Sequence, residues 1–311
     1  MLLPPRLKAD LALVGVTLIW GTTFVVIKAA LADVSPLLFI LLRFAIAAPL
    51  LLLVFGRRRG WGQGGVARAG FLVGAFLWAG FAFQTVGLQY TTPAKSAFLT
   101  AWTLVLVPVI AAAVFRQRVR LLVAAGVGAA TLGVYLLTVP AGAFTVGRGE
   151  MITLFCTIAF AGHIVAVGHY VPRHGFAGLA IWQMVAALAL SAASVPLAGL
   201  TGLEQVEIAW TGRLALALGV TAVLGTGLAF SVQTWAQQLT SPTHTALIYS
   251  LESVFAALTS YLVLGERLGP RGLVGAGLIL AGVVLAELKA PPGPELPGAP
   301  ASANPLGGRA V

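Results

Sequence analysis

The chain consists of long apolar runs of about twenty residues, separated by short breaks rich in Pro, Gly and charged residues. A run of about that length crosses the ~30 Å hydrocarbon core of a bilayer as an α-helix. The pattern therefore predicts ten transmembrane helices, which span residues 10–31, 36–55, 66–88, 95–115, 121–138, 150–170, 177–199, 213–236, 243–264 and 272–288.

The pattern is also repeated. Residues 83–136 recur 149 residues later, so that Pro93 aligns with Pro242. A second echo, at an offset of 140, aligns Asp10, Trp20, Phe24 and Arg43 with Glu150, Phe160, Ile164 and Gln183. The two offsets divide the chain into five-helix units, residues 10–138 and 150–288. Because an odd number of crossings turns the second unit upside down, we predict an all-α integral membrane protein with ten transmembrane helices in two inverted five-helix repeats.

Composition supports a chain solvated by lipid. Hydrophobic residues make up 59% of it and charged residues only 9%, too few to coat a soluble globule of this size. The single cysteine, Cys156, excludes an intramolecular disulfide and a thiolate metal cluster, and is expected to be a buried packing residue. The net charge of +10 is explained by basic residues in loops, without a nucleic-acid partner.

The two ends of the chain differ in composition: the first is basic, and the last is rich in Pro, Gly and Ala. Residues 1–9 hold Arg6 and Lys8 ahead of a run of membrane length, which favours a retained first helix over a cleaved signal peptide. Lysine and arginine counts in the loops predict that both termini lie in the cytoplasm of a cell-membrane protein. The Pro/Gly/Ala-rich tail, residues 289–311, lacks periodicity and is predicted to be disordered.

Several short motifs, in order along the chain, resemble one family. They are Ile19-Trp20-Gly21-Thr22-Thr23-Phe24, Arg43-Phe44, and Gly265-Glu266-Arg267-Leu268 followed by Gly275 and Gly282. With the ten helices in two repeats, the chain resembles the EamA family of the drug/metabolite transporter superfamily over residues 8–289. The resemblance implies a central cavity between the repeats and export or import of small metabolites such as amino acids, often driven by proton or ion gradients.

The sequence departs from that family pattern at two places. The first repeat has Phe115-Arg116-Gln117-Arg118-Val119 where the second has Leu264-Gly265-Glu266-Arg267-Leu268, and Ser253 stands at a position often held by proline. These departures limit what the resemblance implies about substrate.

Glu252 is the first candidate for a functional residue, because it falls in the middle of the predicted helix 243–264. An ionised carboxylate at the bilayer centre costs about 2.5–3.5 kcal/mol on insertion scales. Thr245, Tyr249 and Glu252 share one face of that helix, which should look onto a cavity or a partner. Glu252 is either a coupling or substrate-binding carboxylate, or a structural one that is hydrogen-bonded to its neighbours or paired with Arg43.

Other candidates lie on the remaining helices. Arg43 either receives a carboxylate or pairs internally. Trp20 and Thr23 share a strip of the first helix with Ile27, and Trp20 either lines a cavity or packs against neighbours. Trp102 and Thr103, the repeat counterpart of Glu252, are treated in the same way.

Several polar side chains have a structural interpretation beside a functional one. His163 has no metal-ligand spacing around it, and is either a cavity histidine or an ordinary hydrogen-bonded one. Gln84 and Gln233 either bind substrate or cross-link helices. Lys28 and Lys95 are expected to reach the lipid headgroups. The small-residue rows 126–133 and 275–282 favour an internal helix seam and leave a homodimer face open.

The leading hypothesis is a secondary active transporter for a small metabolite, with an amino acid or related compound and export favoured. It requires no cofactor and no metal, and proton or ion coupling is open. A passive channel or facilitator is the alternative. An intramembrane enzyme is disfavoured, because the chain has no Gly-x-Ser-x-Gly and no His-Glu-x-x-His, and Glu252 is the only carboxylate deep in a predicted helix. The absence of a Walker-type phosphate loop argues against direct use of ATP.

Overall fold

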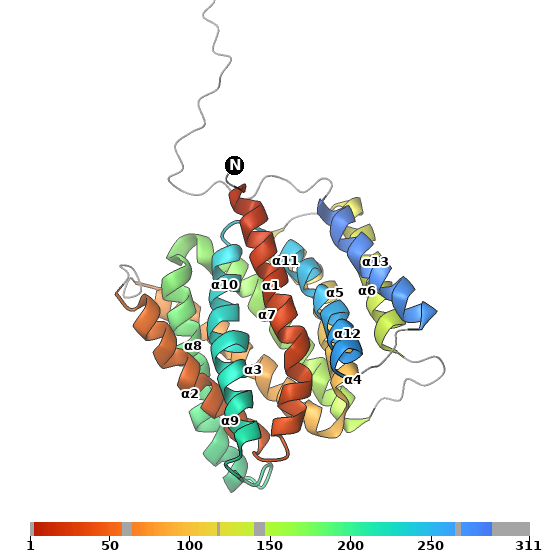
Figure 1. The fold of residues 1–311 in the computed structure, drawn as a ribbon. Helices are drawn as coiled ribbons and strands as arrows, with labels where there is room; N and C mark the ends of the chain where they lie inside the picture. Colours follow the sequence, from red (N-terminus) through yellow and green to blue (C-terminus); the bar gives the residue numbers. More distant parts are fainter. Residues whose placement is uncertain (1–2, 58–63, 117–118, 140–146, 265–268, 288–311) are drawn as a thin grey trace, which may run out of the picture.

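The computed structural model describes residues 3–57, 64–116, 119–139, 147–264 and 269–287. Throughout these segments the named elements are helices, and Figure 1 shows them side by side as one bundle. They are α1 (Pro5–Ala30), α2 (Pro36–Phe55), α3 (Val66–Tyr90), α4 (Pro93–Ala101), α5 (Thr103–Phe115), α6 (Leu121–Thr138), α7 (Arg148–His174), α8 (Phe176–Leu200), α9 (Gly212–Gly219), η1 (Val220–Leu228), α10 (Ala229–Ala236), α11 (Pro242–Tyr249), α12 (Leu251–Leu264) and α13 (Pro270–Glu287).

The helix starts follow from local chemistry. Proline stands at the first position of α1, α2, α4, α11 and α13, where its missing N–H would have no intrahelical acceptor in any case. The side chains of Thr92 and Ser241 cap α4 and α11 by accepting hydrogen bonds from the backbone N–H of Lys95 and His244, at 3.3 and 3.2 Å. These two caps are repeat counterparts, since 241 minus 92 is 149.

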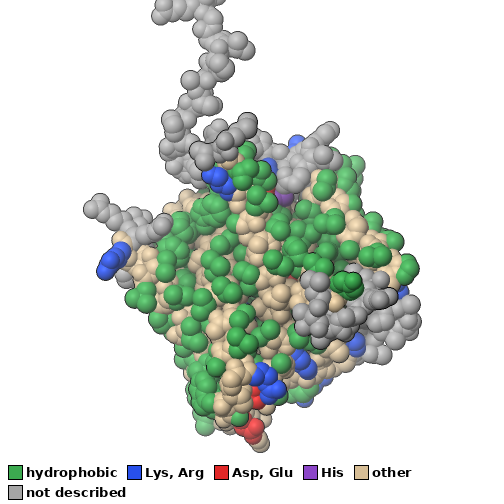
Figure 2. All heavy atoms as spheres, in the orientation of Figure 1, with side chains coloured by type: hydrophobic (Ala, Val, Ile, Leu, Met, Phe, Trp, Pro, Cys, Tyr) green, Lys and Arg blue, Asp and Glu red, His purple; other side chains and the backbone are tan. Residues whose placement is uncertain are grey.

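Seven helical segments in the described part of the chain are long and apolar enough to cross a membrane. They are Pro5–Ala30, Pro36–Phe55, Val66–Tyr90, Lys95–Phe115, Arg148–His174, Phe176–Leu200 and Gly212–Ala236. Shorter apolar helices span Leu121–Leu137 and Pro270–Leu285. On the face that Figure 2 shows, apolar side chains cover the middle of the molecule, and Lys and Arg lie toward its edges. The predicted count of ten spans therefore stays a prediction.

Two predicted helices are broken, which corrects the sequence analysis. The predicted helix 95–115 divides at Trp102 into α4 and α5, and 243–264 divides at Ser250 into α11 and α12. At the second break Ser250 donates both its N–H and its hydroxyl to the carbonyl of Leu247, at 3.1 and 2.6 Å, which tightens the turn. Glu252 consequently lies in the first turn of α12, and not in the middle of a helix.

A third departure is a π-helical segment inside the predicted helix 213–236. Residues 220–228 form η1 between α9 and α10. The hydroxyl of Thr226 donates to the carbonyl of Thr221, five residues back, at 2.8 Å. Segments of this kind occur frequently at functional sites.

The helices pack in a pattern that is preserved when the two halves are exchanged. Packed pairs include α1 with α12 and α7 with α5, α3 with α7 and α1 with α10, and α3 with α8 and α2 with η1. The pairs α2 with α8 and α6 with α13 are their own counterparts. Gly133 lies against the backbone of Gly275, and Gly282 against Ala130. The two small-residue rows therefore form a seam within the chain, as the internal-seam interpretation expects.

Loops on one face join the halves. Arg213 donates to Asp33 through Nε and Nη2 at 2.8 and 2.5 Å, and Thr211 adds a hydrogen bond at 2.7 Å. These donors hold the pKa of Asp33 below its usual value of 3.8. An antiparallel bridge pairs Val34 with Ile208 beside them. Glu204 accepts from the backbone N–H of Leu37 at 3.0 Å, and burial raises its pKa.

Two lysines are bound inside the protein, so the expectation that they reach the headgroups is wrong. Lys28 donates to the carbonyls of Leu88, Gln89 and Thr91 at 2.6, 3.0 and 3.0 Å, at the C-terminal end of α3. Lys95 pairs with Glu150 at 3.3 Å. The last carbonyls of a helix lack intrahelical donors and a carboxylate makes charge-assisted hydrogen bonds, so both are good partners for an ammonium. The motif at residues 265–268 and the tail 289–311 lie outside the described residues.

Candidate functional site: a central cavity between the halves

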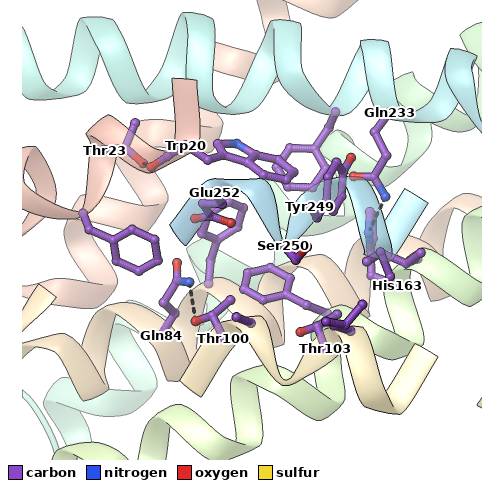
Figure 3. Close-up of a pocket in the computed structure, with 18 of the residues that line it drawn as sticks. Trp20, Thr23, Gln84, Thr100, Thr103, His163, Gln233, Tyr249, Ser250 and Glu252 are labelled. Carbon is purple, nitrogen blue, oxygen red and sulfur yellow. Dashed lines mark hydrogen bonds between the residues drawn. The ribbon is translucent and has the colours of Figure 1, made fainter. Parts of the chain in front are cut away.

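A cavity lies between the two halves of the chain, at the level of both helix breaks (Figure 3). Its walls come from α1, α2 and α3, from the α4–α5 and α11–α12 breaks, and from α7 and α10. The lining residues are Trp20, Thr23, Phe24, Ile27, Arg43, Phe81, Gln84, Thr100, Ala101, Thr103, Leu104, Phe160, His163, Ile164, Phe230, Gln233, Ala246, Tyr249, Ser250 and Glu252.

All of the candidate residues except Trp102 meet in this cavity. Those present are Glu252, Tyr249, Trp20, Thr23, Arg43, Gln84, Thr103, His163 and Gln233. Trp102 instead lines a groove on the outside with Phe98 and Tyr135, and 43% of its surface is exposed. Neighbouring residues in a helix point about 100° apart, and here Thr103 faces the cavity while Trp102 faces the outer groove. The cavity alternative is therefore wrong for Trp102.

Arg43 is buried in the cavity wall with part of its guanidinium unused. Its Nε donates to the hydroxyl of Thr226 and its Nη2 to the carbonyl of Gly225, at 3.3 Å for the latter. The guanidinium carbon lies 4.1 Å from the centre of the Phe81 ring, a cation–π contact. Within the described residues Nη1 has no hydrogen-bond partner, although Arg43 is only 1% exposed. Since buried donors are normally satisfied, Nη1 is a ready site for an anionic group.

Trp20 links the first helix to the π-helical segment. Its indole N–H donates to the carbonyl of Gly225 at 2.8 Å, the same carbonyl that Arg43 uses. Its ring packs against Phe230 and Tyr249, with centroids 5.2 and 4.9 Å apart. Trp20 therefore lines the cavity and also packs against its neighbours, so that both interpretations hold.

Glu252 contributes a carboxylate without a protein partner. It is half-buried at the cavity wall, and within the residues that the structure describes it forms no hydrogen bond or ion pair. The alternative of a structural pair with Arg43 is therefore wrong. Its position in the first turn of α12 places it at the positive end of the helix dipole, which favours a carboxylate by about 0.3–1 kcal/mol.

His163 and Gln233 belong to a buried amide network. The Nε2 of His163 lies 2.9 Å from Gln183 Oε1, and its Nδ1 lies 3.4 Å from Gln233 Nε2. Gln233 also donates to Gln237 at 3.0 Å, while its Oε1 has no partner within the described part of the chain. His163 is thus both hydrogen-bonded and cavity-lining, and no group of metal-ligating residues is found across the described ranges.

The first half contributes hydroxyl and amide groups. Gln84 donates to the hydroxyl of Thr100 at 3.1 Å. The buried hydroxyls of Thr103 and, across the cavity, Tyr249 have no partner among the described residues. Groups of this kind bind a polar ligand without reorganisation, because they have no protein bond to give up.

The cavity wall is itself built from repeat counterparts. At the offset of 149, Phe81, Gln84, Thr100 and Thr103 correspond to Phe230, Gln233, Tyr249 and Glu252; at 140, Trp20 and Thr23 correspond to Phe160 and His163. Sequence reasoning missed Phe81, Phe230 and Thr100 as wall residues. The repeat match would have found the two phenylalanines had it been extended two residues before Phe83.

The arrangement offers one cation and one anion to a ligand within an aromatic wall. Arg43 comes from the first half, where its counterpart in the second is the neutral Gln183. Glu252 comes from the second half, where its counterpart in the first is Thr103. A small solute that carries both charges, with an apolar remainder, matches these groups chemically.

Comparisons with known proteins identify a family and relatives that this chain resembles. A sequence model described as the EamA-like transporter family matches it twice, over residues 7–139 and 147–288. An uncharacterized transporter of Archaeoglobus fulgidus is 39% identical over 284 residues, which are 91% of this chain and 87% of the relative. A probable amino-acid metabolite efflux pump of Salmonella typhimurium is 28% identical over 298 residues, 87% of this chain and 91% of the relative.

One solved crystal structure has the same fold. It superposes with a TM-score of 0.73 and covers 90% of this chain and 96% of its own, at 20% sequence identity. At that identity the likeness concerns the fold alone.

Proposed function

Since the chain belongs to the EamA-like transporter family, we propose that it is a secondary active transporter that moves a small metabolite by alternating access at the central cavity. The proposed substrate is an amino acid or a related compound, and export is favoured. The names of its relatives, an efflux pump among them, place the family's activity in transport and not in enzyme catalysis.

The observation that carries the proposal is the pair of unmatched charges in the cavity. A buried guanidinium nitrogen and a half-buried carboxylate, both without partners within the described residues, are costly unless a ligand completes them. An α-carboxylate would complete Arg43 and an α-ammonium would complete Glu252, while the rings of Trp20 and Phe230 would pack against the side chain.

Two inverted repeats are part of the proposal. The double match of the family, the helix pairs that persist when the halves are exchanged, and the repeat-related cavity wall all favour them. In such carriers the substrate site lies where broken helices of the two repeats meet, and one repeat rocks against the other. The breaks at Trp102 and Ser250 fit that arrangement.

Glu252 is the proposed coupling group. A carboxylate in an apolar wall binds a proton or a substrate ammonium in preference to staying ionised alone. Because a proton and a substrate ammonium would compete for the single carboxylate of Glu252, the protein would exchange one for the other across the membrane.

The proposed location is the cell membrane, with both termini in the cytoplasm. Basic residues on the N-terminal side outnumber those on the other face. The cavity would then load substrate from the cytoplasm for export.

The test is flux into liposomes that contain the purified protein. A mixed pool of amino acids and related metabolites is offered with and without an imposed pH gradient. We expect gradient-driven uptake of a zwitterionic solute, lost in Glu252→Gln and reduced at least about tenfold in Arg43→Gln, since each removes a charge-assisted contact. The matched control is Glu207→Gln, an exposed loop carboxylate outside the cavity wall.

Other results would change the proposal. Flux that ignores the gradient and survives Glu252→Gln would indicate a passive facilitator with a structural glutamate. If Arg43→Gln still transports cations at the parent rate, the substrate does not need a carboxylate, and the proposed zwitterionic class would be wrong.

A further inference from the structure

Two acid–base pairs connect the halves and are counterparts of each other. Asp10 of α1 pairs with His244 of α11, with Oδ1 and Nε2 3.1 Å apart. Glu150 of α7 pairs with Lys95 of α4, with Oε1 and Nζ 3.3 Å apart. Glu150 follows Asp10 by 140 residues and His244 follows Lys95 by 149, the two offsets of the repeat.

The pairs lie on opposite faces. The hydroxyl of Thr91 donates to Glu150 at 2.6 Å, and the carbonyl of Thr91 accepts from Lys28, near the end of α1. Asp10 lies near the start of α1, 18 residues before Lys28. At 1.5 Å per residue this is about 27 Å of helix, close to the thickness of the hydrocarbon core.

Each pair ties a broken helix to the first helix of the other half. Lys95 lies in α4, the half-helix that ends beside Thr103, and His244 lies in α11, which ends beside Glu252. Separating the halves on one face must break the pair on that face. The half-helix released by the break is continuous with the cavity wall.

The two pairs differ in how far their carboxylates are shielded from solvent and in how many further hydrogen bonds they accept. The Glu150 side chain is 5% exposed and also accepts from the backbone N–H of Gly147 at 2.8 Å. The Asp10 side chain is 17% exposed, with Arg6 at 4.0 Å. Thr240, the counterpart of Thr91, is buried, and in the described part of the molecule its hydroxyl has no hydrogen-bond partner. The bond that Thr91 makes to Glu150 thus has no equivalent on the Asp10 face.

We propose that Lys95–Glu150 and His244–Asp10 are the two gates of the cavity, each completed by its threonine, Thr91 or Thr240. The structure has the Glu150 gate fully closed and the Asp10 gate closed without its threonine. This inference rests on the proposed alternating access, which needs one gate on each face.

Cavity accessibility tests the gates without measuring transport, so that an absent flux would not obscure the result. A reporter cysteine replaces Thr103 in a Cys156→Ser background, and a membrane-impermeant thiol reagent is applied to each face of sealed vesicles. We expect Glu150→Gln to raise labelling from the Glu150 face about tenfold, because it loses a charge-assisted contact. Asp10→Asn should raise labelling from the opposite face, about threefold.

Asp33→Asn is the matched control. Asp33 also pairs across the halves, on the same face as Glu150, but its partner Arg213 lies at the start of α9 and not in either of the half-helices α4 and α11. Its substitution should leave labelling unchanged. An equal rise in Asp33→Asn, or a rise from both faces in Glu150→Gln, would overturn the proposal.

A charge exchange separates a gate from a fold requirement. Glu150→Lys combined with Lys95→Glu should return labelling toward the parent rate, and continued high labelling in the double variant would contradict an ion-pair gate. If Glu150→Gln does not fold, Lys95→Gln breaks the same pair at a side chain that is 30% exposed.

Discussion

Two carboxylates in this protein show how partners decide a residue's role. Asp33 accepts hydrogen bonds from Arg213 and Thr211, which stabilise its ionised form and join the loop after α1 to the start of α9. Glu252 faces the cavity with no such donor within the described residues. The first carboxylate joins two parts of the fold, and the second has no protein partner within the described residues.

The paired carboxylate predicts a pH dependence of stability. Because the pKa of Asp33 is lower in the folded protein than its usual value of 3.8, its contribution is complete above that value and is lost as the pH falls through the lowered pKa. We expect Asp33→Asn to melt at a lower temperature than the parent at pH 7. The difference should shrink below about pH 4.

Melting temperatures in detergent across this pH range measure the effect. Glu207→Gln, at an exposed loop position, is the control and should follow the parent. A gap between parent and Asp33→Asn that is unchanged down to pH 3 would show that the stabilisation does not depend on ionisation.

At the scale of elements, the sequence predicted where helices lie but not how they are interrupted. Apolar length gave bounds such as 36–55 and 121–138, which agree with α2 and α6. The breaks at Trp102 and Ser250 lie inside runs whose periodicity continues unchanged. Both breaks have tightened local bonds, from the N–H of Trp102 to Leu99 and from the N–H of Ser250 to Leu247, and the hydroxyl of Ser250 adds another. Hydropathy does not record bonds of this kind.

The same limit applies to the cavity. Intramembrane polarity singled out Glu252, Arg43 and Gln233, because a polar group at that depth needs a reason. It could not separate Thr103 from Trp102, since the choice between neighbouring helical positions depends on rotation about the axis. Hydropathy likewise does not reveal the π-helical segment η1, although its Gly225 carbonyl accepts hydrogen bonds from both Trp20 and Arg43.

The α6–α13 seam predicts a contrast between two glycines of one helix. A Cβ at Gly275 would meet the backbone oxygen of Gly133 at 2.6 Å, whereas a Cβ at Gly277 would meet nothing within 4 Å. Gly275→Ala should destabilise the protein by about 1–3 kcal/mol through overpacking. Gly277→Ala, the control, should be neutral or slightly stabilising because alanine favours helix.

Thermal unfolding in detergent compares the two variants directly. Equal melting temperatures for Gly275→Ala and Gly277→Ala would mean that α6 and α13 do not pack closely in solution.

At the scale of the whole molecule, the charges at the two ends predict an orientation. The loop that holds Leu203 lies on the same face as Asp33, joined by the bridge from Val34 to Ile208, and Gly64 follows α2 on the other face. With the N-terminus inside, an impermeant thiol reagent applied to intact cells should label Leu203→Cys and not Gly64→Cys, both in a Cys156→Ser background. The reverse pattern would place the termini outside, and labelling of both would contradict the predicted crossings.

The unequal charges of the two halves have a consequence for the direction in which a solute binds. Two identical half-length chains about a two-fold axis would present every side chain twice, and a solute with distinct ends could bind in two equivalent directions. In this single chain, Arg43 aligns with a glutamine and Glu252 with a threonine. The cavity therefore presents one guanidinium and one carboxylate, and the proposed zwitterionic solute has a single direction in which to bind.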